Sequence, residues 1–134
     1  MMHPQLRTAF EQEMLAAQAA YGRQDWREAY RLLERAHILG QHHAVPHTRS
    51  HIWFLKVGWQ RRDLWEISGQ LLRIVGGFIA SLLGKVPVGN SGGADVSAFA
   101  EMPIPEDLRE ILIKDERSWQ GIVRAREKSG SKSR

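Results

Sequence analysis

The sequence contains no cysteine, and this absence removes several kinds of site at once. Disulfide bonds, thiolate-bound zinc, iron–sulfur clusters and a cysteine nucleophile all require a thiol. Long apolar runs are also absent, since the longest uncharged one, residues 74–84, is about half of the roughly 20 residues that a membrane-spanning helix needs. We therefore expect no membrane span. Because no apolar leader opens the sequence, we also expect a cytoplasmic location.

An excess of positive charge is absent from most of the chain, although the formal net charge is +4. Residues 123–134 contain five basic residues and one acidic residue, so residues 1–122 are formally neutral. A protein that binds nucleic acid usually carries a basic stripe on its folded surface, and we therefore predict no nucleic-acid partner. The Ser- and Gly-rich residues 129–134 are typical of a disordered tail.

Apolar residues recur at intervals of three and four along much of the chain, which is the spacing of one helix face. A first stripe runs from Leu6 to Tyr21, and another runs from Ile67 to Leu82. Two Asp-x-x-Glu sequences, at 25–28 and 63–66, are typical of capped helix N-termini. Together these signals predict helices at residues 5–21, 26–39, 46–62, 64–84 and 106–114.

The two capping sequences start 38 residues apart, and each is followed by a Leu-Leu pair. This repeated pattern suggests two helix-turn-helix units packed as in tetratricopeptide repeats. The sequence therefore predicts an all-α bundle of four to five helices, forming a single domain over residues 1–114. Residues 85–105, rich in Pro and Gly, are predicted to be a long ordered loop. Residues 115–134 are predicted to be a helical extension followed by a basic disordered tail.

Histidine is concentrated in one segment, because five of the six histidines lie between residues 37 and 51. His47 and His51 are four residues apart, so they share one helix face and can bind one metal ion. Glu34 and His37 form the Glu-x-x-His pair that helical bundles use for iron or manganese. Since a short turn joins the two predicted helices, these four side chains are expected to converge. The sequence predicts one divalent metal ion, zinc or iron, bound by all four.

Gln70 is expected on the core-facing side of its helix, where it would support the metal ligands or simply pack between helices. Other interpretations of the cluster are a hydrogen-bonded polar core and a pH-responsive or haem-related group of histidines. A second hypothesis is a helical-repeat interaction module with structural histidines, which would bind a protein partner or a second copy of the chain. Binding or homeostasis of the metal is favoured over catalysis, because no residue outside the ligand set is clearly a base.

Several ordered sequence blocks resemble a bacterial family that is known as a domain of unknown function. These blocks are ERAHILGQ at 34–41, the HxxxH spacing at 47–51, GQLLR at 69–73, PVGNSGG at 87–93 and MPIP at 102–105. The resemblance covers most of residues 7–112. It implies a small all-helical bacterial protein whose relatives occur in gene neighbourhoods for metal-ion transport and resistance. It implies no established activity.

The resemblance also bears on the candidate ligands. The family pattern includes Glu34 and all three histidines of the proposed ligand set, whereas His42 and His43 do not clearly belong to it. Ser91 stands where the family usually has Thr, a change that keeps the hydroxyl group. The four residues that the helix spacing predicts as ligands are thus also positions of the family pattern.

Overall fold

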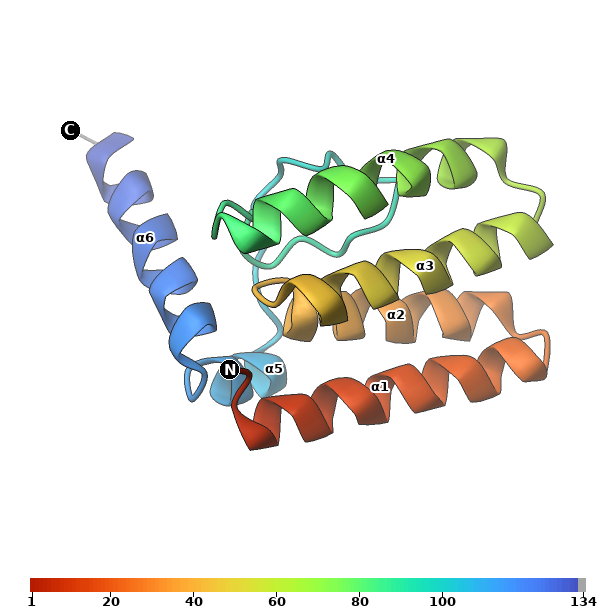
Figure 1. Cartoon of the computed structure of the whole chain (residues 1–134), viewed down its shortest axis with the longest axis horizontal. Helices are drawn as coiled ribbons and strands as arrows, with labels where there is room; N and C mark the ends of the chain where they lie inside the picture. The colour runs from red at the N-terminus through yellow and green to blue at the C-terminus, as the bar shows by residue number, and fades with distance from the viewer. Residues whose placement is uncertain (133–134) are drawn as a thin grey trace.

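The computed structural model describes residues 1–132, and this part of the chain forms six helices and no strand. The all-α class predicted from the sequence is thereby confirmed. The helices, shown in Figure 1, are α1 (Pro4–Gly22), α2 (Trp26–Gly40), α3 (Ala44–Gln60), α4 (Leu64–Leu82), α5 (Glu106–Leu112) and α6 (Glu116–Lys132). Within the described residues, none of these helices is long and apolar enough to cross a membrane.

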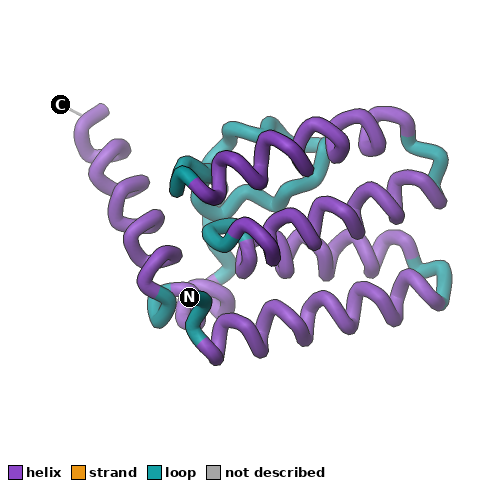
Figure 2. Tube along the Cα trace, in the orientation of Figure 1, coloured by secondary structure: helices purple, strands orange, loops and turns teal. Residues whose placement is uncertain are grey.

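The first four helices lie side by side along one direction and alternate in sense (Figure 1). α1 packs against α2, α2 against α3, and α3 against α4. The short α5 and the longer α6 lie at one end of this bundle, where the N-terminus and the turn between α2 and α3 are also found (Figure 2). This end of the bundle holds the candidate site.

Aspartate side chains begin two of the helices in the way that the sequence predicts. The Asp25 carboxylate accepts a hydrogen bond from the backbone N–H of Glu28 (3.1 Å), and Asp63 accepts one from Glu66 (3.0 Å). α3 begins two residues before the predicted start at Pro46. Pro46 is its third residue, where a missing N–H is harmless because the first turn has no internal acceptor for it.

The apolar core is formed by α1, α2, α3 and α5, with one residue of α6. Burying a large apolar side chain contributes roughly 1.5–3 kcal/mol, so these residues hold the bundle together. The largest fully buried apolar side chains are Phe10, Phe54, Leu6, Met14, Leu33, Leu39, Leu108 and Leu112.

Unlike the core helices, α4 buries polar residues and exposes apolar ones. Its buried residues are Glu66, Gln70 and Ser81. Leu72 is 78% exposed and Phe78 is 40% exposed. The apolar stripe between Ile67 and Leu82 therefore does not face the core, because the space under α4 is filled by polar side chains of the candidate site.

The tail differs from its prediction. α6 continues to Lys132, so residues 129–132 are helical rather than disordered, while residues 133–134 lie outside the described residues. The Asp115 carboxylate caps this helix by accepting hydrogen bonds from the backbone N–H and the hydroxyl of Ser118 (both 3.0 Å). Arg, Glu and Lys between residues 124 and 128 favour this helix, which then continues through the weaker helix formers Ser129, Gly130 and Ser131.

Candidate metal centre

Three imidazoles converge inside the bundle, near the end that carries α5 and α6. The Nε2 atom of His47 lies 2.8 Å from Nε2 of His37 and 3.0 Å from Nε2 of His51. Each pair of ring centroids is 4.7 Å apart, so the rings form an even triangle. All three residues are at most 5% exposed. Among residues 1–132, this is the one group of at least three potential ligand residues whose ligand atoms lie within 4.8 Å of one another.

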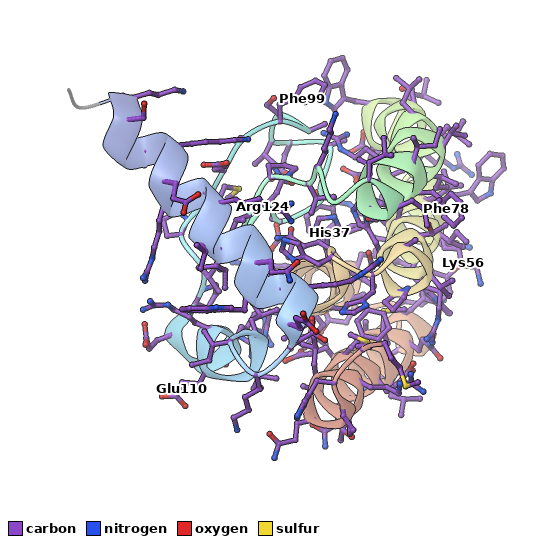
Figure 3. All side chains as sticks on the ribbon, turned by 60° about the vertical axis from the view of Figure 1, so that its left-hand side comes forward. His37, Lys56, Phe78, Phe99, Glu110 and Arg124 are labelled. Carbon is purple, nitrogen blue, oxygen red and sulfur yellow. The ribbon has the colours of Figure 1, made fainter. Side chains whose placement is uncertain are left out.

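The hairpin of α2 and α3 supplies all three rings. His37 lies in the last turn of α2, while His47 and His51 occupy successive turns of α3. A turn of only three residues, 41–43, joins the helices and brings the end of one beside the start of the other. Figure 3 shows His37 in the interior at this end of the bundle. The spacing argument from the sequence thus predicts the convergence of these three side chains.

A different group accepts a hydrogen bond from the other nitrogen, Nδ1, of each ring. His37 donates to the backbone carbonyl of Asn90 (2.7 Å), and His51 donates to Oε1 of Gln70 (2.6 Å). His47 donates to the hydroxyl oxygen of Ser81. Ser81 gives its own hydrogen to the carbonyl of Gln41 (2.8 Å), so its oxygen is free to accept. These contacts fix every ring in the tautomer with hydrogen on Nδ1 and a lone pair on Nε2.

Three lone pairs therefore point at one another in a buried space of low dielectric constant. Two neutral imidazoles of this tautomer cannot hydrogen bond through Nε2, because neither atom carries a hydrogen. A proton does not fill the gap at neutral pH, since burial lowers the pKa of His47 to about 4 and that of His51 to about 3. Burial and the two neighbouring rings also hold the pKa of His37 well below its usual value. The arrangement fits a cation other than a proton.

The partners of the rings are themselves held in place. The amide nitrogen of Gln70 donates to Glu66 (2.6 Å) and to the backbone carbonyl of Gly92 (2.9 Å). Glu66 also accepts hydrogen bonds from the backbone N–H of Ala94 and from the hydroxyl of Tyr30 (3.2 Å to each from the same carboxylate oxygen). α4 and the loop after it therefore form a second layer of polar groups around the imidazoles.

Glycines let this loop approach the rings closely. Gly92 has a φ of +85°, and a Cβ there would lie 2.5 Å from the ring of His37. A Cβ at Gly93 would lie 1.9 Å from the hydroxyl of Tyr30. At Gly92 the left-handed backbone and the short contact both disfavour a side chain, and at Gly93 the short contact does so. The GNSGG sequence thus positions the Asn90 carbonyl on His37.

The family comparison covers the whole of this arrangement. Residues 4–112, which hold all three imidazoles and their partners, match a family described as a protein of unknown function (DUF3703). The chain belongs to the DUF3703 family. The resemblance to a family of unknown function is therefore confirmed. No curated protein and no solved structure matches the chain.

Glu34, the fourth predicted ligand, is not a member of the group formed by the three imidazoles. It lies half-buried on α2, and burial together with the carboxylates of Asp95 and Glu66 raises its pKa to about 7. The two carboxylates that raise the pKa of Glu34 thus belong to α4 and the loop after it. Gln70 lies where the sequence predicts, buried and in contact with a candidate ligand.

Sequence reasoning missed two partners of the rings, Ser81 and Asn90. Both are buried polar residues, 1% and 3% exposed. Ser81 carries no sequence signal of its own, because a serine near the end of an apolar helix is common. Asn90 had a signal in its GNSGG block, since two adjacent glycines after a short polar residue indicate a close backbone approach.

Proposed function

We propose that this protein binds one divalent metal ion through Nε2 of His37, His47 and His51, in the service of metal homeostasis or resistance. The observation that supports the proposal is the convergence of three buried Nε2 atoms, whose lone pairs are inferred from the oxygen acceptors that Nδ1 of each ring contacts. Without a cation, these nitrogens repel one another and lose their hydrogen bonds to water. With a metal ion, each lone pair gains a bond.

The ligand chemistry favours zinc or iron. Three neutral imidazoles suit borderline divalent ions, and zinc binds imidazole nitrogen at about 2.0–2.1 Å. A tetrahedral ion with such bonds separates its ligand nitrogens by roughly 3.3 Å, so the rings need to move apart by only a few tenths of an ångström. Three protein ligands leave one position of a tetrahedral ion open to another molecule.

The hydrogen bonds on Nδ1 add to the support. Histidines that bind metals almost always donate their other N–H to an oxygen acceptor, which fixes the tautomer and makes the ligand more basic. All three rings do so, through Asn90, Gln70 and Ser81. The proposed ligand set contains only the imidazoles, and Gln70 has the supporting role that the sequence predicts for it.

A second candidate function is the helical-repeat interaction module with structural histidines, with tetratricopeptide-like packing. The exposed apolar side chains of α4 favour it, since Trp65 is 75% exposed and Val75 is 66% exposed. Large exposed apolar patches mark surfaces that contact other proteins. A second copy of the chain would cover this face in a symmetric dimer, and light scattering of the purified protein measures that dimer directly.

The test of metal binding compares two single-histidine variants. The parent protein, freed of metal by a chelator, is titrated with zinc and with ferrous iron by calorimetry, and its melting temperature is followed. We expect one equivalent to bind. At a free metal concentration about 100 times Kd, the metal should stabilise the fold by about 2.7 kcal/mol.

His47→Ala should abolish this binding, because the Nε2 atom of His47 lies within 3.0 Å of the Nε2 atoms of both other rings. His3→Ala is the matched control, since it removes an imidazole at the N-cap of α1, outside the cluster. The control should bind like the parent. Equal metal binding by His47→Ala and the parent, or no metal binding by the parent, would overturn the proposal.

A further inference from the structure

A cavity of about 330 Å³ is lined by all three imidazoles. Part of its wall comes from α4, at Leu72, Gly76 and Ala80. Another part comes from the loop after α4, at Pro87 and Phe99. Ligand sites are usually about 300–1,000 Å³ and largely apolar, so this cavity has room for one small molecule.

The charge around the cavity has one sign. Arg73 and Lys85 line it, and none of its lining residues, all within the described part of the chain, is acidic. The three imidazole ligands are neutral, so they leave the two positive charges of a divalent ion uncompensated. A metal-loaded site therefore carries an excess of positive charge beside a low-dielectric wall, where an anion binds strongly.

Arg73 is held close to the imidazoles with hydrogen-bonding capacity to spare. One terminal nitrogen, Nη2, donates to the backbone carbonyl of Val96 (2.7 Å), which anchors the side chain to the loop. Its Nε atom is buried and has no hydrogen-bond partner among the described residues. A buried donor without a partner costs about 1–3 kcal/mol, and an oxygen of a bound anion would remove that cost.

The apolar walls of the cavity favour a bound anion whose remaining part is apolar. Leu72 is 78% exposed and Phe99 is 90% exposed, and both border the cavity. Figure 3 shows Phe99 at the outer edge of the loop, above the interior position of His37. An inorganic oxyanion would leave these apolar groups in water, whereas an organic anion with an apolar body would cover them. Each buried CH₂ group contributes roughly 0.8 kcal/mol.

From these observations we infer that the metal-loaded protein binds a small monocarboxylate with an aliphatic body. The carboxylate takes the open position on the metal and contacts Arg73, and the aliphatic body lies between α4 and the loop. This inference rests on the proposed function, because the metal supplies the primary contact.

The experiment uses the full chain loaded with Co²⁺, whose visible absorption reports its coordination, and hexanoate as the probe. Metal stoichiometry is measured first, and hexanoate is then added. We expect hexanoate to change the Co²⁺ spectrum with a saturable dependence, while hexanamide, which has the same body without the charge, should leave it unchanged. The metal-free protein should not bind hexanoate.

Arg73→Gln should keep one equivalent of metal but bind hexanoate roughly tenfold more weakly, the weight of one charge-assisted hydrogen bond. Arg61→Gln removes an exposed arginine outside the cavity and should behave as the parent. Gly76→Leu places a side chain at a cavity-lining position with open space around it, and it should block hexanoate while the metal still binds.

The outcomes separate the two hypotheses. A parent that binds no metal ends the proposed function and this inference together. A parent that binds one metal but shows no spectral response to hexanoate, or responds equally to hexanamide, overturns the inference and leaves the proposed function standing. Unchanged hexanoate affinity in both Arg73→Gln and Gly76→Leu also overturns it.

Discussion

A triangle of three buried histidines and a single buried histidine lie a few residues apart in this protein. Their rings carry hydrogen on opposite nitrogens. In the triangle of His37, His47 and His51, hydrogen is on Nδ1, and the Nε2 atoms face only one another. His43, at the α2–α3 turn, uses Nε2 as the donor to both carboxylate oxygens of Asp115 (2.9 and 3.0 Å). Burial alone therefore does not distinguish a ligand from a structural histidine. What distinguishes the triangle is that the Nε2 atoms of several rings converge.

The Asp115 region is complete without any further molecule. Its carboxylate also accepts a hydrogen bond from the backbone N–H of His3 (2.8 Å), so it ties the N-terminus, the α2–α3 turn and α6 together. Burial raises the pKa of Asp115, but the hydrogen bonds from His3, Ser118 and His43 outweigh that effect and lower it to about 2. The imidazole triangle lacks such a counterion, and the predictions below exploit that difference.

The largest effect is expected from acid on the metal-free protein. The pKa values of His47 and His51 are lowered by burial from 6.5 to about 4 and about 3, so the unfolded chain binds more protons than the folded one. Stability is then full above pH 6.5 and falls as the pH drops toward those lower values. Between pH 7 and 5 the two rings should cost about 4 kcal/mol. Urea unfolding in the presence of a chelator measures the loss.

His3→Ala should retain this dependence on pH, because the ring it removes lies outside the triangle. His47→Phe should reduce the loss by about a third, since burial lowers the pKa of His37 as well and one of three titrating rings is gone. A metal-free parent whose unfolding free energy is the same at pH 5 and pH 7 would contradict the buried, neutral state of the triangle.

The next effect concerns the Asp115 region. Asp115→Ala should lower the free energy of unfolding by about 3 kcal/mol, because His43 and two backbone N–H groups lose a buried acceptor. Zinc affinity should stay that of the parent. Asp107→Ala is the control, since Asp107 pairs with Arg35 at an exposed position and should cost much less. A large drop in zinc affinity in Asp115→Ala would show that the two regions are coupled.

A smaller effect is expected around the triangle itself. Gln70→Met keeps the size of the side chain but removes the acceptor of the His51 Nδ1–H, so zinc affinity should fall roughly 10- to 100-fold. Calorimetric titration measures this change. Gln120→Met alters an exposed glutamine on α6 and should have no effect on affinity. Unchanged affinity in Gln70→Met would reduce Gln70 to a packing residue.

The smallest effect concerns His42, which belongs to neither arrangement. Both of its ring nitrogens are buried without a hydrogen-bond partner among the described residues. His42→Leu should therefore raise the free energy of unfolding by about 1 kcal/mol and leave zinc binding unchanged. His43→Leu should do the opposite to stability, since it leaves Asp115 without its partner. Destabilisation by His42→Leu in urea unfolding would indicate that this ring has a partner after all.

The sequence carries enough information to predict the helices and the meeting of three histidines. Helical spacing puts His47 and His51 on one face, and the short turn after Gly40 places His37 opposite them. These are local relations, which act within a few residues and depend little on the rest of the fold. The same local relations do not predict the place of Glu34. It lies one helical turn before His37, where the carboxylates of Glu66 and Asp95 raise its pKa.

The outward orientation of the apolar stripe of α4 could not be predicted from hydropathy, although the sequence predicts the burial of Gln70. An apolar stripe normally faces the core, yet this helix buries Gln70 and Ser81 because they contact two of the imidazoles. The preference arises from hydrogen bonds to α3, not from the hydropathy of α4. The Asn90 contact is missed for a similar reason, since it joins a loop to a helix more than fifty residues earlier.

The division of the site between the α2–α3 hairpin and the segments that follow it sets an order of events in time. All three imidazoles belong to residues 37–51, and a loop of about ten residues closes in roughly 10–100 ns. The hairpin can therefore bring together the three ligands of the proposed metal ion before α4 and residues 83–105 have folded over them.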